Sequence, residues 1–387
     1  MSRTQEVVVM DIGSSKIRIL AVEKPNKGIF SVKQIIQQPH DGYYDGEWVD
    51  GDNTADAIAQ AVTRMRDAGV RFKRLYVAVP SEFCRVKTAR TQTSFAKKRK
   101  VEHADIEALF KKGNPFDNDM TACVINRSSV FFTVEGNKKL VDPEGVYTEE
   151  LMGYLSYIAC QRRVIEFLDK VFQRVGVVDV EYTCGMFAEM MCVFDSTVRD
   201  NGVVLAIDAG YLSSTVALMR GDGIMYMRSF PCGKGVFAAW LQEGLDIPFA
   251  SAEALYDKTD LSYEARESDC YTVDVVGADG EHTDASFPIS TVQSYITECI
   301  AVFANNVHCI LQEFDDMMSI TAGMYLMGGG LALRGAEDCL SKKMNRKVRY
   351  IAPNMCPEYK KPMHAGLIGI AHYAFAQEDK KRNRFWK

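Results

Sequence analysis

The sequence lacks the features that mark membrane-spanning, secreted and nucleic-acid-binding proteins. No stretch approaches the roughly 18 apolar residues that a membrane-spanning helix needs. The 11 cysteines are an odd number without any Cys-x-x-Cys pair, which argues against a disulfide framework or a zinc site. The formal net charge of −5 argues against a general nucleic-acid binder. Because an apolar run starts directly after the first six residues, we expect no signal peptide and a cytoplasmic protein.

What is present describes an ordinary globular chain that is long enough for two lobes. Its 387 residues are 47% hydrophobic and 25% charged, and a single core of that size is unusual. Alternating strand and helix patterns favour an α/β protein. We expect helices at residues 53–67, 103–112, 161–174, 185–194 and 289–313, strands at 75–79 and 121–134, a basic irregular stretch at 85–100, and an acidic, loop-rich region at 257–288.

Two segments in different halves of the chain share one pattern, an apolar run that ends in Asp-x-Gly. They are residues 7–15, with Asp11 and Gly13, and residues 203–210, with Asp208 and Gly210. Each pattern is typical of a buried strand that enters a tight turn, although one alone is as well explained by an ordinary hairpin. Glycine lets the backbone approach a ligand, turn N–H groups can hold phosphate oxygens, and the carboxylate can hold hydrated Mg²⁺. Two such hairpins facing each other would clamp a nucleoside triphosphate.

A third segment supplies a glycine run. The apolar strand pattern of residues 324–327 leads into Gly328, Gly329 and Gly330. A turn without side chains allows a flat base or sugar to lie against the backbone. The same residues could equally form a flexible turn between a strand and a helix. The two preceding hairpins favour the first interpretation.

The order of Asp-x-Gly hairpin, Asp-x-Gly hairpin and Met-Gly-Gly-Gly resembles the actin, hexokinase and DnaK-type chaperone ATPase superfamily. The resemblance implies that the hairpins are two phosphate loops and that the glycine run is an adenosine loop. Residues 230–235 and 361–369 resemble the two connecting segments of that superfamily, in which small residues let helices cross.

Within that superfamily the sequence resembles the FtsA family, actin-like bacterial proteins that tether the FtsZ division ring to the membrane. The stretches that carry the resemblance are residues 11–16, 41–50, 74–80, 140–147 and 150–159. It implies an α/β, actin-like ATPase fold, with two related lobes around a nucleotide cleft and an FtsA-type inserted subdomain. The implied boundaries are 1–82 and 161–198 for lobe 1, 83–160 for the inserted subdomain, 199–360 for lobe 2, 361–379 for a return helix and 380–387 for a tail.

The resemblance also implies ATP and Mg²⁺ as cofactors. It assigns hydrated Mg²⁺ to Asp11 and Asp208, and Asp208 is the only candidate for orienting a water, so any ATP turnover is expected to be slow. The implied nucleotide-binding residues are Asp11, Gly13, Ser14, Ser15 and Lys16 on one side of the phosphates, Gly210 and Ser213 on the other, Gly233 in the first connecting segment, Glu253 near the ribose, and Gly328, Gly329 and Gly330 at the adenosine.

The second phosphate loop departs from the family pattern. FtsA proteins usually carry Asp-x-Gly-Gly-Gly-Thr there, whereas residues 208–215 of this chain read Asp-Ala-Gly-Tyr-Leu-Ser-Ser-Thr. Two interpretations stay open. Either the loop is wider and Ser213, Ser214 or Thr215 contacts phosphate, or triphosphate binding is impaired.

The tail and one internal run are basic. Residues 380–387 combine five basic residues with Phe and Trp, which fits a peripheral anchor on an anionic leaflet, and the alternative is a solvated tail. FtsA proteins are similar in ending with a basic-aromatic helix. That implies membrane contact by Arg382, Arg384, Phe385, Trp386 and Lys387. The run at residues 97–100 could likewise contact an acidic partner or lipid, although such runs are usually solvated loops.

The resemblance implies a cell division adaptor that binds ATP, self-associates into protofilaments and tethers FtsZ to the inner face of the cytoplasmic membrane at the division site. The C-terminal tail of FtsZ would bind lobe 2 at about residues 257–318, and nucleic acid would not be a partner. Two alternatives share the superfamily, a pilus-assembly actin-like protein of the PilM type and a sugar or acid kinase. The basic-aromatic tail favours the FtsA type, and neither a clear substrate-cleft Asp nor a second large domain supports a kinase.

Overall fold

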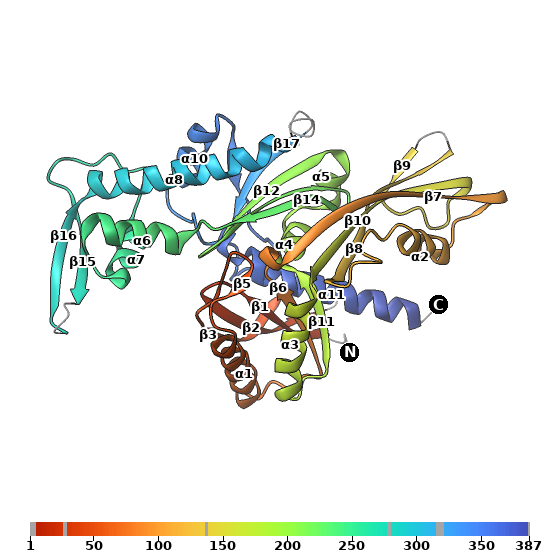
Figure 1. Cartoon of the computed structure of the whole chain (residues 1–387), viewed down its shortest axis with the longest axis horizontal. Coiled ribbons are helices and arrows are strands. Elements are labelled where there is room, and N and C mark those ends of the chain that lie inside the picture. The colour runs from red at the N-terminus through yellow and green to blue at the C-terminus, as the bar shows by residue number, and fades with distance from the viewer. Residues whose placement is uncertain (1–4, 26–28, 136–137, 277–279, 315–320, 386–387) are drawn as a thin grey trace.

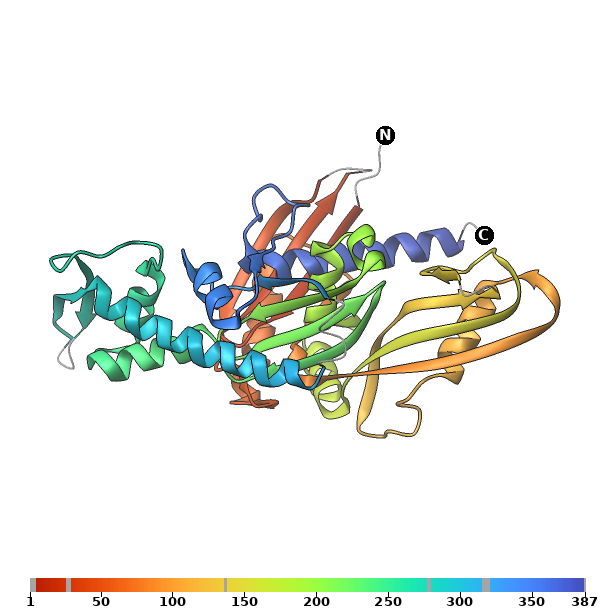
Figure 2. The ribbon, with the colours of Figure 1, turned by 90° about the horizontal axis from the view of Figure 1, so that it is seen from above.

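Two lobes and a third, separate sheet make up the computed structural model, which describes residues 5–25, 29–135, 138–276, 280–314 and 321–385 (Figure 1). Each lobe is built on a five-stranded sheet, and the third sheet has four strands. Seen from above, the third sheet and the far end of lobe 2 extend in opposite directions from the centre (Figure 2). No helix in these ranges combines the length and the apolar character that a bilayer crossing requires.

The first lobe has the strand order β11-β6-β1-β2-β3. Its strands are β1 (Gln5–Ile12), β2 (Lys16–Lys24), β3 (Ser31–Pro39), β6 (Arg74–Val79) and β11 (Asp179–Cys184). The strands β1, β2 and β3 form an antiparallel meander, whereas β6 runs parallel to β1 and β11 runs parallel to β6. Alternate residues of β1 face opposite sides of the sheet, so Val8 and Met10 join one buried cluster and Val7 and Val9 join another.

Helices cover both faces of this first sheet. The cluster around Met10 includes residues of α1 (Gly51–Asp67) and α3 (Arg162–Arg174). The cluster around Val9 includes residues of α4 (Gly185–Val193) and α11 (Ala365–Phe385). A small hairpin of β4 (Tyr43–Tyr44) and β5 (Glu47–Trp48) precedes α1.

The second lobe repeats the plan of the first. Its strand order is β14-β13-β12-β17-β18, and the strands are β12 (Val203–Ala209), β13 (Ser214–Arg220), β14 (Gly223–Phe230), β17 (Thr321–Met327) and β18 (Val348–Tyr350). Three antiparallel strands are again followed by two parallel ones. The expectation of two related lobes in an α/β fold is therefore confirmed.

Helices and one hairpin complete the second lobe. The helices are α5 (Ser196–Asn201), α6 (Lys234–Leu245), α7 (Phe249–Lys258), α8 (Ile289–Gln312) and α10 (Ala336–Met344). The hairpin of β15 (Cys270–Val276) and β16 (His282–Pro288) lies at the far end of the lobe, beside α6 and α7 (Figure 1).

The third sheet lies between β6 and α3 in the chain and packs on the second lobe. Its strands are β7 (Cys84–Lys100), β8 (Ala122–Val134), β9 (Lys138–Leu140) and β10 (Tyr147–Gln161), in the order β7-β10-β8-β9, and α2 (His103–Lys112) covers it. The turn between β13 and β14 touches this sheet, because the backbone N–H of Asp222 donates to the carbonyl of Ser129 at 3.0 Å. The hydroxyl of Ser156 donates to the carbonyl of Ile224 at 2.5 Å.

The described elements confirm most of the expected ones and correct four. The basic stretch at 85–100 is not irregular, because it forms the edge strand β7. The region at 257–288 is less loop-rich than expected, since it contains β15 and β16. The helix expected from residue 53 starts at Gly51, because Asp50 accepts hydrogen bonds from the backbone of Asp52 and Asn53. The last helix continues past residue 379 to Phe385.

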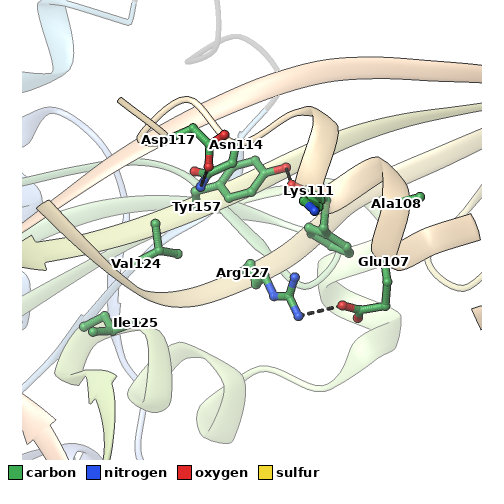
Figure 3. A pocket seen from close by; sticks show the side chains of 10 residues that line it. Glu107, Ala108, Lys111, Asn114, Asp117, Val124, Ile125, Arg127 and Tyr157 are labelled. Atoms are coloured by element: carbon green, nitrogen blue, oxygen red, sulfur yellow. Dashed lines mark hydrogen bonds and ion pairs between the residues drawn. The ribbon is translucent and has the colours of Figure 1, made fainter. Parts of the chain in front are cut away.

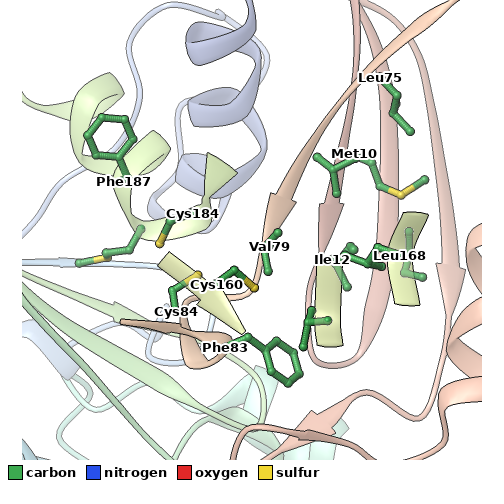
Figure 4. Packing of buried hydrophobic residues seen from close by; sticks show 14 of the residues in the cluster. Met10, Ile12, Leu75, Val79, Phe83, Cys84, Cys160, Leu168, Cys184 and Phe187 are labelled. Carbon is green, nitrogen blue, oxygen red and sulfur yellow. The ribbon is translucent and has the colours of Figure 1, made fainter. Parts of the chain in front are cut away.

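The third sheet joins the first lobe through a tightly packed junction. The 3-10 turn Ser81–Phe83 carries the chain from β6 into β7, and the side chain of Phe83 is buried beside that of Cys84. Figure 4 shows Cys84, Cys160 and Cys184 grouped there, close to Val79 at the end of β6. A second 3-10 turn, Pro362–His364, precedes α11.

Candidate functional site

The two hairpins and the glycine run line one cavity of about 1070 Å³ between the lobes. Every nucleotide-binding residue named from the sequence lines it except one. The lining residues are Asp11, Gly13, Ser14, Ser15, Lys16, Asp208, Gly210, Ser213, Glu253, Gly328, Gly329 and Gly330. The exception is Gly233, where an added Cβ would lie 2.5 Å from the carbonyl oxygen of Gly210, so its missing side chain allows close packing against the second hairpin.

The turns of the two hairpins are closed in the same way. The N–H of Gly13 donates to the carbonyl of Lys16 at 3.1 Å, and the N–H of Gly210 donates to the carbonyl of Ser213 at 3.1 Å. The second turn is therefore closed over the same number of residues as the first. The backbone N–H of Leu212 donates to the hydroxyl of Ser14 at 3.0 Å, which joins the two turns.

Carboxylates gather at the base of the cleft. Burial raises the pKa of Asp208 to about 6, and the nearby charge of Asp11 adds to the rise. Burial and the same two aspartates raise the pKa of Glu189 well above its usual value. The Oε2 atom of Glu189 is buried and has no hydrogen-bond partner in the protein. A third carboxylate with a free oxygen therefore joins the two that the sequence identifies.

Three basic side chains, those of Lys16, Arg18 and Lys234, also line the cavity. Arg18 forms an ion pair with Asp11, its direct partner in the β1–β2 register. Lys234 forms ion pairs with Asp257 at 2.9 Å and with Glu253 at 3.7 Å. Burial lowers the pKa of Lys16, and the charges of Arg18 and Lys234 lower it further. The three basic side chains therefore converge on one place, which suits a polyphosphate.

The donor set fits a hydrated divalent cation. Asp11 of lobe 1 and Asp208 of lobe 2 both line the cavity, and Glu189, which lines it too, has an oxygen without a hydrogen-bond partner in the protein. In the described part of the chain, no group of three or more His, Cys, Asp or Glu side chains is arranged to hold an ion directly. Carboxylates that contact the waters of Mg²⁺ suit this arrangement, because Mg²⁺ usually keeps several waters.

The glycine run lies directly on the second hairpin. The N–H of Gly330 donates to the carbonyl of Ala209 at 2.6 Å. A Cβ on Gly330 would lie 2.2 Å from the carbonyl oxygen of Gly210, and one on Gly328, which has φ of 86°, would lie 2.2 Å from Oδ1 of Asp208. Gly329 instead has room for a side chain, since its nearest neighbour is Met363 at 3.5 Å. Glycine is therefore required at two of the three positions.

The side chain of His40 hydrogen-bonds to the turn of the first hairpin. Its Nε2–H donates to the carbonyl of Gly13 at 2.7 Å, because Nδ1 accepts from the N–H of Gly42 at 3.2 Å. Burial lowers the pKa of His40, which keeps the ring neutral. A Cβ on Gly42 would lie 2.0 Å from the carbonyl oxygen of Ser14, so residues 40–42 support the turn closely.

Two solved structures with this arrangement of lobes are a pilus biogenesis complex and a protein bound to ADP. A chain of the PilM–PilN type IV pilus biogenesis complex superimposes with a TM-score of 0.63 at 15% identity, covering 95% of this chain and 98% of that chain. MreB5 of Spiroplasma citri bound to ADP gives a TM-score of 0.60 at 11% identity, covering 98% and 99%. The chain has the actin-like ATPase fold.

Sequence comparison points to one group within this actin-like fold. FtsA of Enterococcus hirae is 21% identical over 381 residues, covering 97% of this chain and 84% of that protein. FtsA of Staphylococcus epidermidis is 23% identical over 377 residues, covering 96% and 79%. FtsA of Helicobacter pylori is 24% identical over 285 residues, covering 70% and 56%. No protein-family model matches the chain. The resemblance to FtsA drawn from the motifs is confirmed over most of the chain.

The predicted membrane residues up to Phe385 lie at the end of α11, near the C-terminus in Figure 1. Arg382 is exposed in α11, with its guanidinium 3.9 Å from Asp379. Arg384 and Phe385 belong to the same helix. Trp386 and Lys387 lie outside the described residues. Sequence reasoning missed Arg18, Glu189 and His40, which the actin-like cleft brings next to the predicted residues.

Proposed function

We propose that the chain binds ATP with Mg²⁺ in the cleft, self-associates and tethers FtsZ polymers to the cytoplasmic membrane at the division site. The observation that carries the nucleotide part is the pair of like hairpins, joined by Ser14 and Leu212, with the glycine run in the same cavity. The similarity to FtsA proteins over most of the chain supports the division part.

Different residues of the cleft would bind Mg²⁺ and the phosphates of the nucleotide. Mg²⁺, when bound, neutralises charge on the phosphates, and Asp11, Asp208 and Glu189 would hold it through its waters. The backbone turn at residues 13–16 and the side chains of Lys16 and Arg18 would hold phosphate oxygens on one side. Gly210, Ser213 and Lys234 would hold them on the other. With its pKa raised to about 6, Asp208 is the group that could accept a proton from a water. We propose at most a slow ATPase activity.

We also propose which segments of the chain contact FtsZ and the membrane. We assign residues 1–82 and 161–198 to lobe 1, 83–160 to an FtsA-type insert, 199–360 to lobe 2 and 361–379 to the return segment, whose helix α11 continues to Phe385. The region of 257–318 that would take the FtsZ tail contains the exposed hairpin β15–β16 and all of α8. Residues 380–387 would supply the membrane contact, and assembly into protofilaments would multiply that weak contact.

One observation favours the second candidate, a PilM-type adaptor that binds a short peptide of a membrane partner. A cavity of about 540 Å³ opens on the third sheet, between α2 and β8 (Figure 3). Its walls combine the apolar side chains of Val124, Ile125 and Tyr157 with the ion pair between Arg127 and Glu107 at 2.7 Å. An apolar floor with a charged rim suits an extended peptide.

The tether is tested by sedimenting the purified chain with anionic liposomes and FtsZ polymers, beside a version without residues 380–387. We expect the intact chain to carry FtsZ onto the liposomes and the shortened chain to leave it in solution. Trp386→Ser should weaken recruitment, whereas Trp240→Ser, at an exposed tryptophan of α6, should not. If neither version recruits FtsZ, the FtsA-type proposal fails and the PilM-type candidate takes its place.

Nucleotide binding is tested separately with a fluorescent ATP analogue. Removing one phosphate-binding charge should cost about 2 kcal/mol, which is roughly a thirtyfold loss of affinity. We expect that loss for Lys16→Met and none for Lys33→Met on the outer strand β3. Equal affinity for both variants and the unaltered chain would contradict the assignment of the cleft.

A further inference from the structure

Three thiols meet where the third sheet joins the lobes, outside the nucleotide cleft. Cys84 starts β7, Cys160 lies near the end of β10, and Cys184 ends β11. Cys84 and Cys160 are direct partners on neighbouring antiparallel strands. Both Cys160 and Cys184 lie close enough to Cys84 to shift the pKa of its thiol, and the Sγ–H of Cys84 donates to the carbonyl of Pro80 at 3.6 Å. The three sulfur atoms therefore form one group, as Figure 4 shows.

The sulfur of Cys184 has hydrogen-bonding neighbours on two sides, and its Sγ–H donates to Sδ of Met227 at 3.7 Å. Cys184 precedes the first residue of α4, so its side chain lies at the amino end of that helix. Its sulfur lies 3.6 Å from the hydroxyl of Ser81. That hydroxyl already accepts the N–H of Met186 at 3.1 Å, so its own proton is directed elsewhere and can reach the sulfur. The backbone N–H of Cys184 donates to Asn126 of β8 at 2.8 Å, which holds the residue against the third sheet.

The two partners differ in acidity. Burial opposes ionisation of Cys184, but hydrogen bonds from Cys84, Phe187 and Ser81 outweigh it, and the pKa of the thiol is lowered. Hydrogen bonds to Cys160 and Cys184, together with burial, raise the pKa of Cys84. The directions of the two pKa shifts favour ionisation of Cys184 over ionisation of Cys84.

We propose that Cys184 and Cys84 form a peroxide-sensitive dithiol site that converts reversibly into a disulfide. The Cys184 thiolate attacks one oxygen of hydrogen peroxide, the O–O bond breaks, and a sulfenic acid and hydroxide result. Hydroxide takes the Cys84 proton and becomes the first water, and the Cys84 sulfur attacks the Cys184 sulfur and expels a second hydroxide. The proton that Cys184 released on ionising converts this second hydroxide into water. Two thiols and one peroxide give one disulfide and two waters, and the peroxide is reduced by two electrons.

The proposed disulfide would connect two parts of the fold. Cys184 is 0% exposed and Cys84 is 9% exposed, so a small oxidant would reach the Cys184 sulfur past Cys84. The bond would link the first strand of the third sheet to the start of α4, the helix that carries Glu189 into the cleft. Oxidation would therefore fasten the third sheet to one wall of the cleft. The inference does not depend on ATP, FtsZ or the membrane.

The test is to treat the reduced, full-length protein with hydrogen peroxide, block remaining thiols and map the cysteines by mass spectrometry. We expect a Cys84–Cys184 linked peptide with the loss of two hydrogen atoms, which dithiothreitol reverses. It should form about tenfold faster than oxidation of the exposed Cys270 and Cys309, because the thiolate is the reacting form. The linked peptide should persist in Cys160→Ser and Cys309→Ser and be lost in Cys184→Ser.

Two results would overturn the proposal. One is a free Cys184 after Cys270 and Cys309 are fully oxidised, since it would show that Cys184 is not the reactive sulfur. The other is a Cys84–Cys160 disulfide in the unaltered protein, which would assign the chemistry to the cross-strand pair. Mapping of the unaltered chain decides both points even if Cys184→Ser does not fold.

Discussion

Ser14 accepts a hydrogen bond from the backbone N–H of Leu212, with 3.0 Å between the two atoms. The bond joins the hairpin turn of one lobe to the hairpin turn of the other, so the two lobes are in direct contact at this hydroxyl. Under the proposed function, a phosphate held between the hairpins would compete with this bond.

The glycine run offers a matched pair of substitutions. Gly330→Ala should destabilise the protein by about 2 kcal/mol or more, because the new Cβ would lie 2.2 Å from a backbone oxygen of the second hairpin. Gly329→Ala should be nearly neutral, since its neighbour lies at 3.5 Å. Urea unfolding of both variants measures the difference. Similar stability for the two would show that the run does not pack on the hairpin.

Asp208 should make the protein less stable as the pH rises. Its pKa is raised to about 6 from 3.8, so the folded state binds a proton that the unfolded state releases. This contribution to stability is complete below about pH 4 and is lost as the pH rises through 6. Because the side chain is partly open to the cleft, we expect Asp208→Asn to gain about 1–2 kcal/mol at pH 8 and nothing at pH 4.

Urea unfolding at both pH values, without nucleotide, measures the Asp208 effect. Asp338→Asn, on an exposed face of α10, removes a carboxylate without touching the cleft and serves as the control. A gain for Asp208→Asn that is equal at pH 4 and pH 8 would contradict the assignment to a buried, ionising carboxylate.

Gly221 tests the contact between lobe 2 and the third sheet. It has φ of 55°, and an added Cβ would lie 2.2 Å from the carbonyl oxygen of Val130. Gly221→Ala should cost about 3 kcal/mol, from the left-handed backbone and the clash together. Gly145→Ala, at a φ of 83° with open space around it, should cost only about 1 kcal/mol. Thermal unfolding measures the loss of stability in both variants. Equal losses would show that the third sheet does not pack against Gly221.

His40 should contribute stability that disappears in acid. Its pKa is lowered, mainly by burial, so the folded state favours the neutral ring. That contribution is present above about pH 6.5 and is lost as the pH falls. His40→Ala should cost about 1–2 kcal/mol at pH 8, since the carbonyl of Gly13 loses its donor, and less at pH 5. The exposed His308→Ala is the control, and unfolding at both pH values gives the comparison.

Helices were predictable wherever one apolar stripe faced a core. The expected helix at 289–313 corresponds to α8, and Val292, Ile296, Ile300 and Phe303, which share one stripe, are all buried. The strand β7 was not predictable in the same way. It lies at the edge of its sheet, where charged side chains on both faces protect the free backbone from unwanted pairing. Because of these basic residues, the sequence of β7 does not show the alternation of apolar and polar residues that identifies a strand.

In the cleft, too, the residues that belong to a local sequence pattern were predictable, whereas a residue brought in by the tertiary fold was not. Asp11 and Asp208 follow from the hairpin pattern, and Arg18 could have been found from it as well. A turn closed between Gly13 and Lys16 places residue 18 opposite residue 11, as the register has it. Glu189 could not be found, because its helix is almost wholly apolar and no local signal shows that one face meets the other lobe.

The length of α11 has a consequence for orientation. The helix runs without interruption from Ala365 to Phe385, and Glu378 is paired with Arg74 at 2.7 Å while Lys381 is paired with Glu181 at 2.6 Å. The basic end is therefore held in a fixed direction by the lobe rather than attached to it by a tether. A surface that captures this end would also set the tilt of the whole molecule, and with it the direction in which neighbouring copies could be added.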